Sequence, residues 1–554
     1  MERPARAAFV GAVVAALITL PGLGAGTLWD NSETAYGEVA REILLAHDWL
    51  VMHLNGHPYF VQPPLYFWFA AIFASLFGTD AFAMRLPSAL ATIVMGALTG
   101  YAVARQAGTR VGIYAAVILS STLMQAVIGR LAIMDALLDL AIAMTIFLWF
   151  RGLESGRDRY AILGWVAAGF GFLAKGLVAP VVALLVIVPY FFWNRRAEPT
   201  YAPTPRAWLL GLLAFLAIVL PWPLAICSRY GFVPMVELIG KYTFGRYTGV
   251  IENQAGPVWY YLPVIVLGFF PWIAFLPMAI VYGVRSLRGD VRINPQLARL
   301  LRLAFVWIVV PLLFFSFART KLPNYVALEF PALALLTALY FEAVVQKGGT
   351  RSAIVSAAVV PLTSGALAMA IWMFSRNNRL TADIADAVPA LLAMAGAIFL
   401  GSLLTAVLVA RARTVRAAPY ALAAAAAIGM DALAVFVLPR AEAYKPVPHL
   451  AAIVERDRKP GDVVAIQSVS GSNALLFYTR PPVVVLAPPD DESPDGEGIA
   501  PARVICDAPR VWVIAPTIRP SYDPTYGRDR RLVAADAKAS LFLYSGPSCT
   551  KSRD

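Results

Sequence analysis

Charge is scarce in this 554-residue sequence: only 14% of the residues are Asp, Glu, Lys or Arg, while 59% are apolar. Soluble domains usually carry roughly 25% charged residues. So few ionic groups cannot cover a surface that faces water on all sides. The composition therefore excludes a wholly soluble protein and predicts a membrane protein with aqueous portions attached.

Cysteine is also rare, with three residues and no CxxC pair, which excludes a disulfide scaffold and a zinc-type cysteine pair. Cys227 lies near a predicted membrane end. Cys506 and Cys549 lie in the C-terminal tail, where they can pair if that tail is extracytoplasmic. The 46 Lys and Arg exceed the 34 Asp and Glu. In a chain with many spans, this surplus indicates cytoplasmic loop charges and argues against nucleic-acid binding.

Apolar runs long enough to cross a bilayer recur along the first 438 residues. They predict thirteen spans, near 7–24, 86–104, 111–128, 133–150, 160–174, 177–193, 207–226, 258–283, 300–317, 326–345, 352–374, 388–410 and 417–438. The first of these follows MERPAR and resembles a signal peptide, but we interpret it as an uncleaved span.

Cations return in every second loop, which sets the orientation, since Lys and Arg are retained on the cytoplasmic side. With the N-terminus inside, these loops hold clusters such as Arg195 and Arg196, or Arg411 and Arg413. An odd number of spans then places the C-terminal segment outside. We therefore expect a membrane-embedded domain over 1–438, with long outer loops at 25–85 and 227–257, and a small extracytoplasmic α/β domain over 439–554.

The tail changes composition abruptly. Short β-favouring runs, DVVAIQS, PPVVVLA, RVWVIAP and ASLFLYS, are bounded by turn-forming residues and follow the helix-like stretch PVPHLAAIVERDRKPG. In the loop 25–85, the segments SETAYGEVAREILLAHDWL and PPLYFWFAAIFASLFG predict two helices lying in the membrane interface. Three histidines of that loop, His47, His53 and His57, are separated by turn signals, which favours a solvated loop over a metal site.

Charged residues outside carry the chemistry that the sequence offers. Asp135, in GRLAIMDALLDL, is costly near hydrocarbon unless it is paired or functional, and Arg130 or another cation could be its partner. Cations on the outer side as a set would suit an anionic lipid headgroup, although snorkelling to the interface explains any single one as well.

At this point the sequence resembles a known family. The segment LWDNSETAYGEVAREILLAHDWLVMHLNGHPYFVQPPLYFWFAAIFASLFG is similar to the first outer loop of bacterial GT-C glycosyltransferases of the protein-mannosyltransferase superfamily, notably the 4-amino-4-deoxy-L-arabinose lipid A transferases. GRLAIMD, GFLAKGLVAP, GPVWYYLPVIVLGFFPW, ARTKLPNYVALEFPALALL and the tail segment YKPVPHLAAIVERDRKPGD match in the same order.

This resemblance implies a polytopic α-helical GT-C fold of about thirteen transmembrane helices with a small C-terminal periplasmic α/β domain. It implies transfer of a sugar from a polyprenyl-phosphate donor to a lipid, glycan or protein acceptor at the periplasmic face of the bacterial inner membrane. The donor phosphate is then the leaving group, which accords with the absence of a nucleotide-binding GxGxxG or GK[ST] motif.

The chain departs from the family at the expected centre. Relatives have an Asp-Glu pair and then an Arg where this chain has Ser32, Glu33 and Ala35, and a Lys where it has Gln62. A His near the Tyr-Tyr segment is replaced by Gln254. The aminoarabinose enzymes use that Glu and His near a bound metal, so these changes argue against a metal in this chain. The sequence assigns no cofactor, and a divalent metal stays an open alternative.

The resemblance assigns the remaining roles position by position. The catalytic candidates are Asp30 and Glu33, either of which could act as general base, and Asp135 at the inner end of the cavity. The candidates that bind the donor phosphate are Arg319, Lys321 and Tyr325, then Arg246 and Arg130, with Gln62 as a neutral hydrogen-bonding position. Ser32, Tyr36 and Tyr59 are assigned to the acceptor side of the first loop.

Two other function classes remain open. A transporter or flippase of lipid-linked sugars would show paired broken helices and internal repeats, and the sequence shows neither. A catalytically impaired homologue that binds a lipid-linked glycan is compatible with the changes at Ser32, Ala35 and Gln62.

Overall fold

The computed structural model describes residues 3–29, 32–198, 200–250, 254–376, 387–467, 472–479, 483–486, 508–517, 529–535 and 539–546. The chain divides into two compact units. The helical unit comprises residues 1–25, 60–69 and 85–439, and the second unit comprises residues 26–59, 70–84 and 440–554. The division differs from the expected one because much of the loop 25–85 groups with the C-terminal segment.

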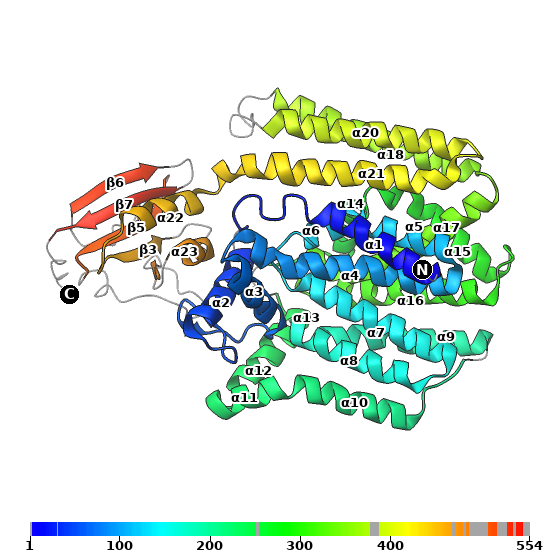
Figure 1. Cartoon of the computed structure of the whole chain (residues 1–554), viewed down its shortest axis with the longest axis horizontal. Coiled ribbons are helices and arrows are strands. Elements are labelled where there is room, and N and C mark those ends of the chain that lie inside the picture. The colour runs from blue at the N-terminus through cyan, green and yellow to red at the C-terminus, as the bar shows by residue number, and fades with distance from the viewer. Residues whose placement is uncertain are drawn as a thin grey trace. The chain divides into compact units, whose positions relative to one another are not determined.

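The helical unit is a bundle whose members are drawn from blue to yellow in Figure 1. Its longer helices are α1 (Arg3–Thr19), α4 (Ala81–Ala107), α5 (Thr109–Ser120), α7 (Asp135–Ser155), α8 (Asp158–Lys175), α9 (Val178–Ala197), α10 (Pro205–Val219), α11 (Pro221–Tyr230), α15 (Leu276–Arg288), α16 (Pro295–Phe317), α17 (Phe330–Gln346), α18 (Arg351–Ser375), α20 (Val388–Ala410) and α21 (Ala418–Ala432). Shorter pieces are α6 (Leu123–Ile128), α12 (Val233–Ile239), η1 (Gly240–Gly245), α13 (Arg246–Thr248), η2 (Val258–Tyr260), α14 (Tyr261–Gly268), η3 (Trp272–Phe275), η4 (Pro323–Glu329), η6 (Val415–Ala417) and η7 (Leu433–Val437).

Every predicted span coincides with a helix or with a pair of consecutive helices. Within the described residues, eight helices are long and apolar enough to cross a membrane, or up to ten if each of two bent pairs is one span. The bent pairs are 205–219 with 221–230, at 43°, and 258–268 with 272–288, at 109°. The protein is therefore a multi-pass α-helical membrane protein. The count of thirteen stays a prediction, because α1 and α5 are short and α8 carries three charged residues.

Glycine lets three helices of the bundle approach closely. A Cβ added to Gly11 on α1 would lie 2.3 Å from the carbonyl oxygen of Gly96 on α4, and one added to Gly100 would lie 2.6 Å from that of Ala7. A Cβ on Gly112 of α5 would lie 2.5 Å from the carbonyl oxygen of Gly100. Small residues at these positions are the usual means by which membrane helices pack backbone to backbone.

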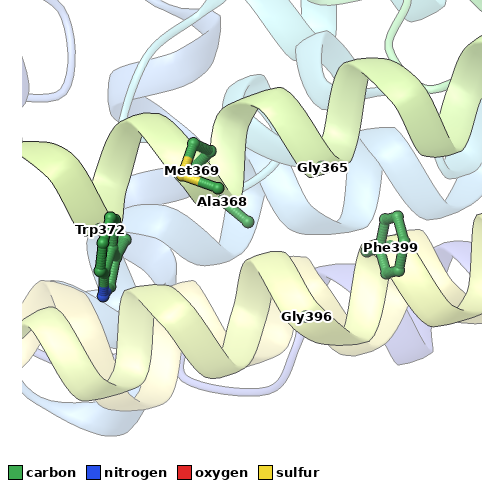
Figure 2. Close-up of a pocket in the computed structure, with 6 residues that line it drawn as sticks. All are labelled: Gly365, Ala368, Met369, Trp372, Gly396 and Phe399. Carbon is green, nitrogen blue, oxygen red and sulfur yellow. The ribbon is translucent and has the colours of Figure 1, made fainter.

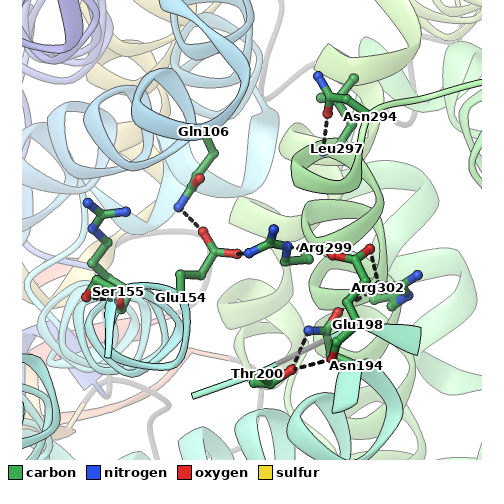
Figure 3. Close-up of polar contacts among 11 residues, drawn as sticks. Gln106, Glu154, Ser155, Asn194, Glu198, Thr200, Asn294, Leu297, Arg299 and Arg302 are labelled. Atoms are coloured by element: carbon green, nitrogen blue, oxygen red, sulfur yellow. Dashed lines mark hydrogen bonds and ion pairs between the residues drawn. The ribbon is translucent and has the colours of Figure 1, made fainter. Parts of the chain in front are cut away.

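An ionic network ties α4, α7, α9 and α16 together (Figure 3). Arg299 of α16 bonds Glu198, which caps α9, at 2.9 Å and Glu154 of α7 at 3.2 Å. Gln106 of α4 donates a hydrogen bond to the other oxygen of Glu154, and Arg302 reaches Glu198 at 3.1 Å. Each buried charge therefore has a partner of opposite sign, which such groups require in a helix bundle.

The second unit contains a five-stranded mixed sheet in the order β4-β3-β5-β7-β6. Its strands are β3 (Val463–Gln467), β4 (Val483–Leu486), β5 (Arg510–Pro516), β6 (Asp529–Ala535) and β7 (Ala539–Ser545). β3 pairs in parallel with β4 and β5, and β7 pairs antiparallel with β5 and β6. The helices α22 (Pro446–Asp457) and α23 (Ser472–Tyr478) belong to the same unit and pack on its core. The predicted α/β domain is confirmed. Cys506 and Cys549 lie outside the described residues, so their predicted pairing stays a prediction.

The N-terminal part of this unit contains α2 (Ser32–Ala46), the short strands β1 (His53–Leu54) and β2 (His57–Pro58), and part of α3 (Leu65–Phe77). Arg41 of α2 donates hydrogen bonds to the carbonyl oxygens of Leu476 and Thr479 at 2.9 and 3.0 Å. Asn55 exchanges two hydrogen bonds with the backbone of Val483, at 2.8 and 3.2 Å. Hydrogen bonds between residues more than 400 positions apart in the sequence thus hold α2 and the segment after it to the C-terminal domain.

Candidate functional site

Two consecutive helices of the bundle place opposite charges at one end. α7 and α8 form a hairpin because Gly156 adopts a left-handed conformation (φ 63°) directly after α7. Asp135 begins α7 and Lys175 ends α8, and each charge suits the dipole of its own helix end. The Lys175 ammonium lies 2.6 Å from the Asp135 carboxylate. Of the partners considered for Asp135, the structure therefore selects another cation, not Arg130.

The loop between α16 and α17 completes this group. Asn324, at the start of η4, donates a hydrogen bond to Asp135 at 2.6 Å. The Lys175 ammonium lies 5.7 Å from the ring centre of the adjacent Tyr325, and Arg246 of α13 reaches the Tyr325 hydroxyl at 3.5 Å. These five residues, which we call the Asp135 cluster, combine one carboxylate, two cations and two neutral hydrogen-bonding groups.

Backbone hydrogen bonds place residues 319–321 beside Arg246 of the cluster. The amides of Arg319 and Thr320 donate to the carbonyl oxygens of Tyr247 and Arg246 at 3.0 and 3.1 Å, and the amide of Lys321 donates to that of Gln254 at 2.8 Å. Residues 246, 247 and 254 therefore lie beside residues 319–321. Arg246 and the exposed Arg319 therefore lie on neighbouring segments of the backbone.

Lys321 was predicted to bind the donor phosphate, and in this structure its ammonium is bonded to the backbone. Its ammonium donates to the carbonyl oxygens of Phe315 at 3.0 Å, Ser316 at 2.6 Å and Ala318. An ammonium group has three donors, so all three are used to cap the end of α16. Burial lowers the pKa of Lys321. Its expected contact with a donor phosphate would require these bonds to break.

Arg130 and Gln62 were also predicted to bind the donor phosphate. Arg130 forms an ion pair with Asp431 at 2.6 Å and bonds the carbonyl oxygen of Pro21, so it joins three segments of the bundle. Gln62 belongs to the helical unit and is buried.

The first-loop candidates fall in the second unit. Asp30 lies outside the described residues. Glu33 is buried in the first turn of α2, and its carboxylate accepts a hydrogen bond from the backbone amide of Trp29 at 2.6 Å. Ser32 begins α2 and Tyr36 lies one turn later, while the amide of Tyr59 donates to the carbonyl oxygen of Met52 at 2.8 Å. These four residues lie on one short segment around α2.

Among the residues that the structure describes, no group of three or more His, Cys, Asp or Glu side chains converges as a metal site would require. The histidines of the first loop lie on or beside β1 and β2, and the backbone of His47 has a positive φ of 52°.

Two members of the cluster were absent from the sequence-derived site. Lys175 is one of the outer cations that the sequence treats only as a set, and Asn324 was not assigned a role. The motif GFLAKG and the loop KLPNY did contain the signal, because Lys175 is the last residue of α8 and Asn324 lies in η4, directly after the segment that follows α16. Which cation pairs with Asp135 depends on the hairpin geometry, which the sequence does not show.

Comparison with known proteins identifies relatives of this chain. Residues 61–224 match the family described as dolichyl-phosphate-mannose-protein mannosyltransferase. Over 344 residues the chain is 33% identical to an undecaprenyl phosphate-α-4-amino-4-deoxy-L-arabinose arabinosyl transferase of Serratia proteamaculans, covering 60% of this chain and 58% of that protein. An enzyme of the same description from Proteus mirabilis is 31% identical over 352 residues, 60% of each chain. The match thus spans less than two thirds of these relatives.

The fold is shared over nearly the whole chain. The crystal structure of ArnT from Cupriavidus metallidurans bound to undecaprenyl phosphate matches with a TM-score of 0.81, covering 98% of this chain and 99% of that one at 20% identity. The apo state of the same protein matches with a TM-score of 0.79. The predicted resemblance and the predicted fold class are both confirmed.

Proposed function

We propose that this protein is a glycosyltransferase that moves a sugar from a polyprenyl-phosphate donor to an acceptor. The Asp135 cluster carries the proposal, because it gathers fixed cations and hydrogen-bond donors where a membrane-embedded phosphate can be bound. The relatives are named for transfer of aminoarabinose from undecaprenyl phosphate, and the similar ArnT structure holds undecaprenyl phosphate. No cofactor is needed for this chemistry.

In this proposal the donor phosphate leaves as the sugar is attacked. Arg246 and Arg319 stabilise the negative charge that grows on the departing phosphate, and the Tyr325 hydroxyl donates a hydrogen bond to it. Cations that are fixed in advance supply the main electrostatic stabilisation in such a step. The contact at 3.5 Å between Arg246 and Tyr325 supports a shared ligand for these two side chains.

Asp135 acts as a positioning residue in this scheme. It neutralises Lys175 and accepts a bond from Asn324, so it orients both groups beside the Tyr325 ring. Lys321 acts as the cap of α16, and we leave it and Arg130 out of the phosphate-binding set, since both have intramolecular partners.

A carboxylate of the first loop accepts the proton of the acceptor hydroxyl. Asp30 and Glu33 are the two candidates, and Ser32, Tyr36 and Tyr59 contact the acceptor. If the acceptor is a phosphate, which is already anionic, the same carboxylate orients it or stabilises positive charge on the sugar ring.

The proposed location is the bacterial inner membrane, with the N-terminus cytoplasmic and residues 440–554 periplasmic. The sugar on the relatives' donor is 4-amino-4-deoxy-L-arabinose. We propose a pentose or hexose on the donor, and a lipid, which includes lipid A, a glycan or a protein as the acceptor.

The test is a transfer assay with the purified protein in lipid, a panel of radiolabelled polyprenyl-phosphate sugars and a membrane extract. We expect label to move to one acceptor class from one donor. Glu33→Gln and Asp30→Asn are compared in the same assay. We expect only one of the two variants to lose transfer, and that variant identifies the base. Donor binding without transfer would instead favour a catalytically impaired homologue, and donor crossing the membrane without transfer would favour a flippase.

A further inference from the structure

A groove of about 350 Å³ lies between α18 and α20 (Figure 2). Its lining is entirely apolar and consists of Gly365, Ala368, Met369 and Trp372 on α18 and Gly396 and Phe399 on α20. This volume lies within the range of roughly 300–1,000 Å³ that is usual for small-ligand sites.

The groove exists because side chains are absent from its floor. A Cβ added to Gly396 would meet no heavy atom within 4 Å, and one added to Gly365 would only touch the ring of Phe399 at 3.3 Å. Ser364 and Ser402, which lie 3.2 Å apart, hold the two helices together beside this opening.

The surroundings of the groove are hydrocarbon. α18 and α20 are both candidate membrane spans, with only 24% and 28% of their apolar windows buried inside the protein. Large apolar side chains such as Leu362, Met373 and Leu400 point outward beside the groove. An apolar groove on the lipid-facing side of a span is filled by an acyl chain of a membrane lipid, because water would find no hydrogen-bond partners there.

One end of the groove carries a cation. The guanidinium of Arg376 lies 4.2 Å from the ring centre of Trp372, one helical turn beyond the lining residues. Gly365 and Trp372 are about 10 Å apart along the helix axis at about 1.5 Å per residue. The cation therefore lies just beyond the end of the groove, where the headgroup of a lipid would follow the part of its acyl chain that fills the groove. Trp372 beside it is of the residue type that marks membrane interfaces.

We infer that this groove is a binding site for an anionic phospholipid, with one acyl chain between Gly365 and Gly396 and the headgroup at Arg376. The apolar lining favours an acyl chain, and the cation at the end of the groove favours a negatively charged headgroup. The site is separate from the Asp135 cluster in its residues and is independent of the proposed transfer reaction.

The test uses the full-length protein in phosphatidylcholine nanodiscs that contain a small fraction of phosphatidylglycerol with a diazirine on its acyl chain. After illumination, peptide mass spectrometry locates the label, and phosphatidylcholine with the same diazirine chain is the matched probe. We expect labelling of 365–372 and 396–399 well above that of Leu400, Leu403, Leu404 and Val407, although these four side chains are more exposed than residues 396–399. We expect phosphatidylglycerol to label about fivefold more than phosphatidylcholine, which corresponds to about 1 kcal/mol for one cation near the membrane surface.

Two variants test separately the binding of the acyl chain in the groove and the binding of the headgroup at Arg376. Arg376→Gln should reduce labelling by phosphatidylglycerol to the level of phosphatidylcholine, whereas Arg413→Gln, at the other end of α20, should leave the preference unchanged. Gly396→Leu should abolish groove labelling by both lipids, and its Cβ would meet no heavy atom within 4 Å. Label spread evenly over 396–407, or a phosphatidylglycerol preference that survives Arg376→Gln, would overturn the inference.

Discussion

At the scale of single residues, the Arg246 and Tyr325 pair makes the sharpest prediction about catalysis. Tyr325→Phe removes one hydrogen bond and should lower the transfer rate about tenfold, since such a bond contributes about 1–1.5 kcal/mol. Arg246→Gln should lower it about a hundredfold, because it removes a fixed charge that we propose to stabilise the leaving phosphate. Initial rates at saturating donor measure both. Tyr242→Phe, on η1, is the matched control and should transfer at the wild-type rate, and an unimpaired Tyr325→Phe protein would refute the assignment.

Glu38 makes a second prediction at this scale, about pH. Burial raises the pKa of Glu38 to about 7, although Arg41, 2.8 Å away, acts in the opposite direction. Between pH 4.5 and 7 the unfolded segment therefore loses a proton that folded α2 keeps. The free energy of opening α2 should fall across this window by up to about 3 kcal/mol and stay level above it.

Hydrogen exchange of the α2 amides, corrected for the intrinsic rate at each pH, measures this change. Glu38→Gln should remove the dependence on pH and protect α2 better than wild type at pH 8. Glu237→Gln, an exposed carboxylate on α12, should retain the wild-type slope. An unchanged slope in the Glu38→Gln protein would show that another group is responsible.

At the scale of helices, the packing of α1 on α4 leaves no room for a methyl group. Gly11→Ala places its Cβ against the backbone of Gly96, so the helices must separate. Overpacking of this kind costs about 1–3 kcal/mol, which lowers the melting temperature by several degrees. Thermal unfolding in nanodiscs measures the shift. Gly396→Ala, which meets nothing within 4 Å, is the control and should melt as wild type; equal melting of both variants would contradict the close approach of α1 and α4.

The ionic network of Figure 3 gives the second prediction for helices. Arg299→Met leaves Glu154, which is nearly buried, without its cation, and should destabilise the bundle by about 3–5 kcal/mol. Adding Glu154→Gln should recover part of that loss, because the uncompensated charge is then gone. A double-mutant cycle on thermal stability measures the coupling, and strictly additive losses would show that the two side chains do not interact.

At the scale of the whole molecule, the alternating loop charges predict the orientation. In a chain whose three cysteines are replaced by serine, Arg531→Cys on β6 should react with a membrane-impermeant maleimide in intact spheroplasts. Asp290→Cys, between α15 and α16, should react only after permeabilisation. Arg531 and Asp290 are both exposed, so accessibility within the protein is matched. Reaction of both in intact spheroplasts, or of Asp290→Cys alone, would contradict the proposed orientation.

Local patterns in the sequence predicted most of this architecture. Apolar runs located each membrane helix, and alternating β-favouring runs located β3, β4, β5 and β7, because both signals depend on neighbours in the chain. β6 was missed, since DRRLVAA is charged and lies at an edge of the sheet. The partners of Asp135 were missed for another reason: Lys175 and Asn324 are 40 and 189 residues away and meet it only through helix packing.

The composition of the second unit has a consequence for biosynthesis. α2 is held by Leu476 and Thr479, and Asn55 is held by Val483, so the first loop completes its contacts only with the end of the chain. About 380 residues separate residue 59 from residue 440. At roughly 5–20 residues per second, the ribosome needs about 20–75 s to make them. During that interval the nascent first loop, with the candidate base Glu33, waits without its partner domain, and a chain terminated before residue 440 never acquires it.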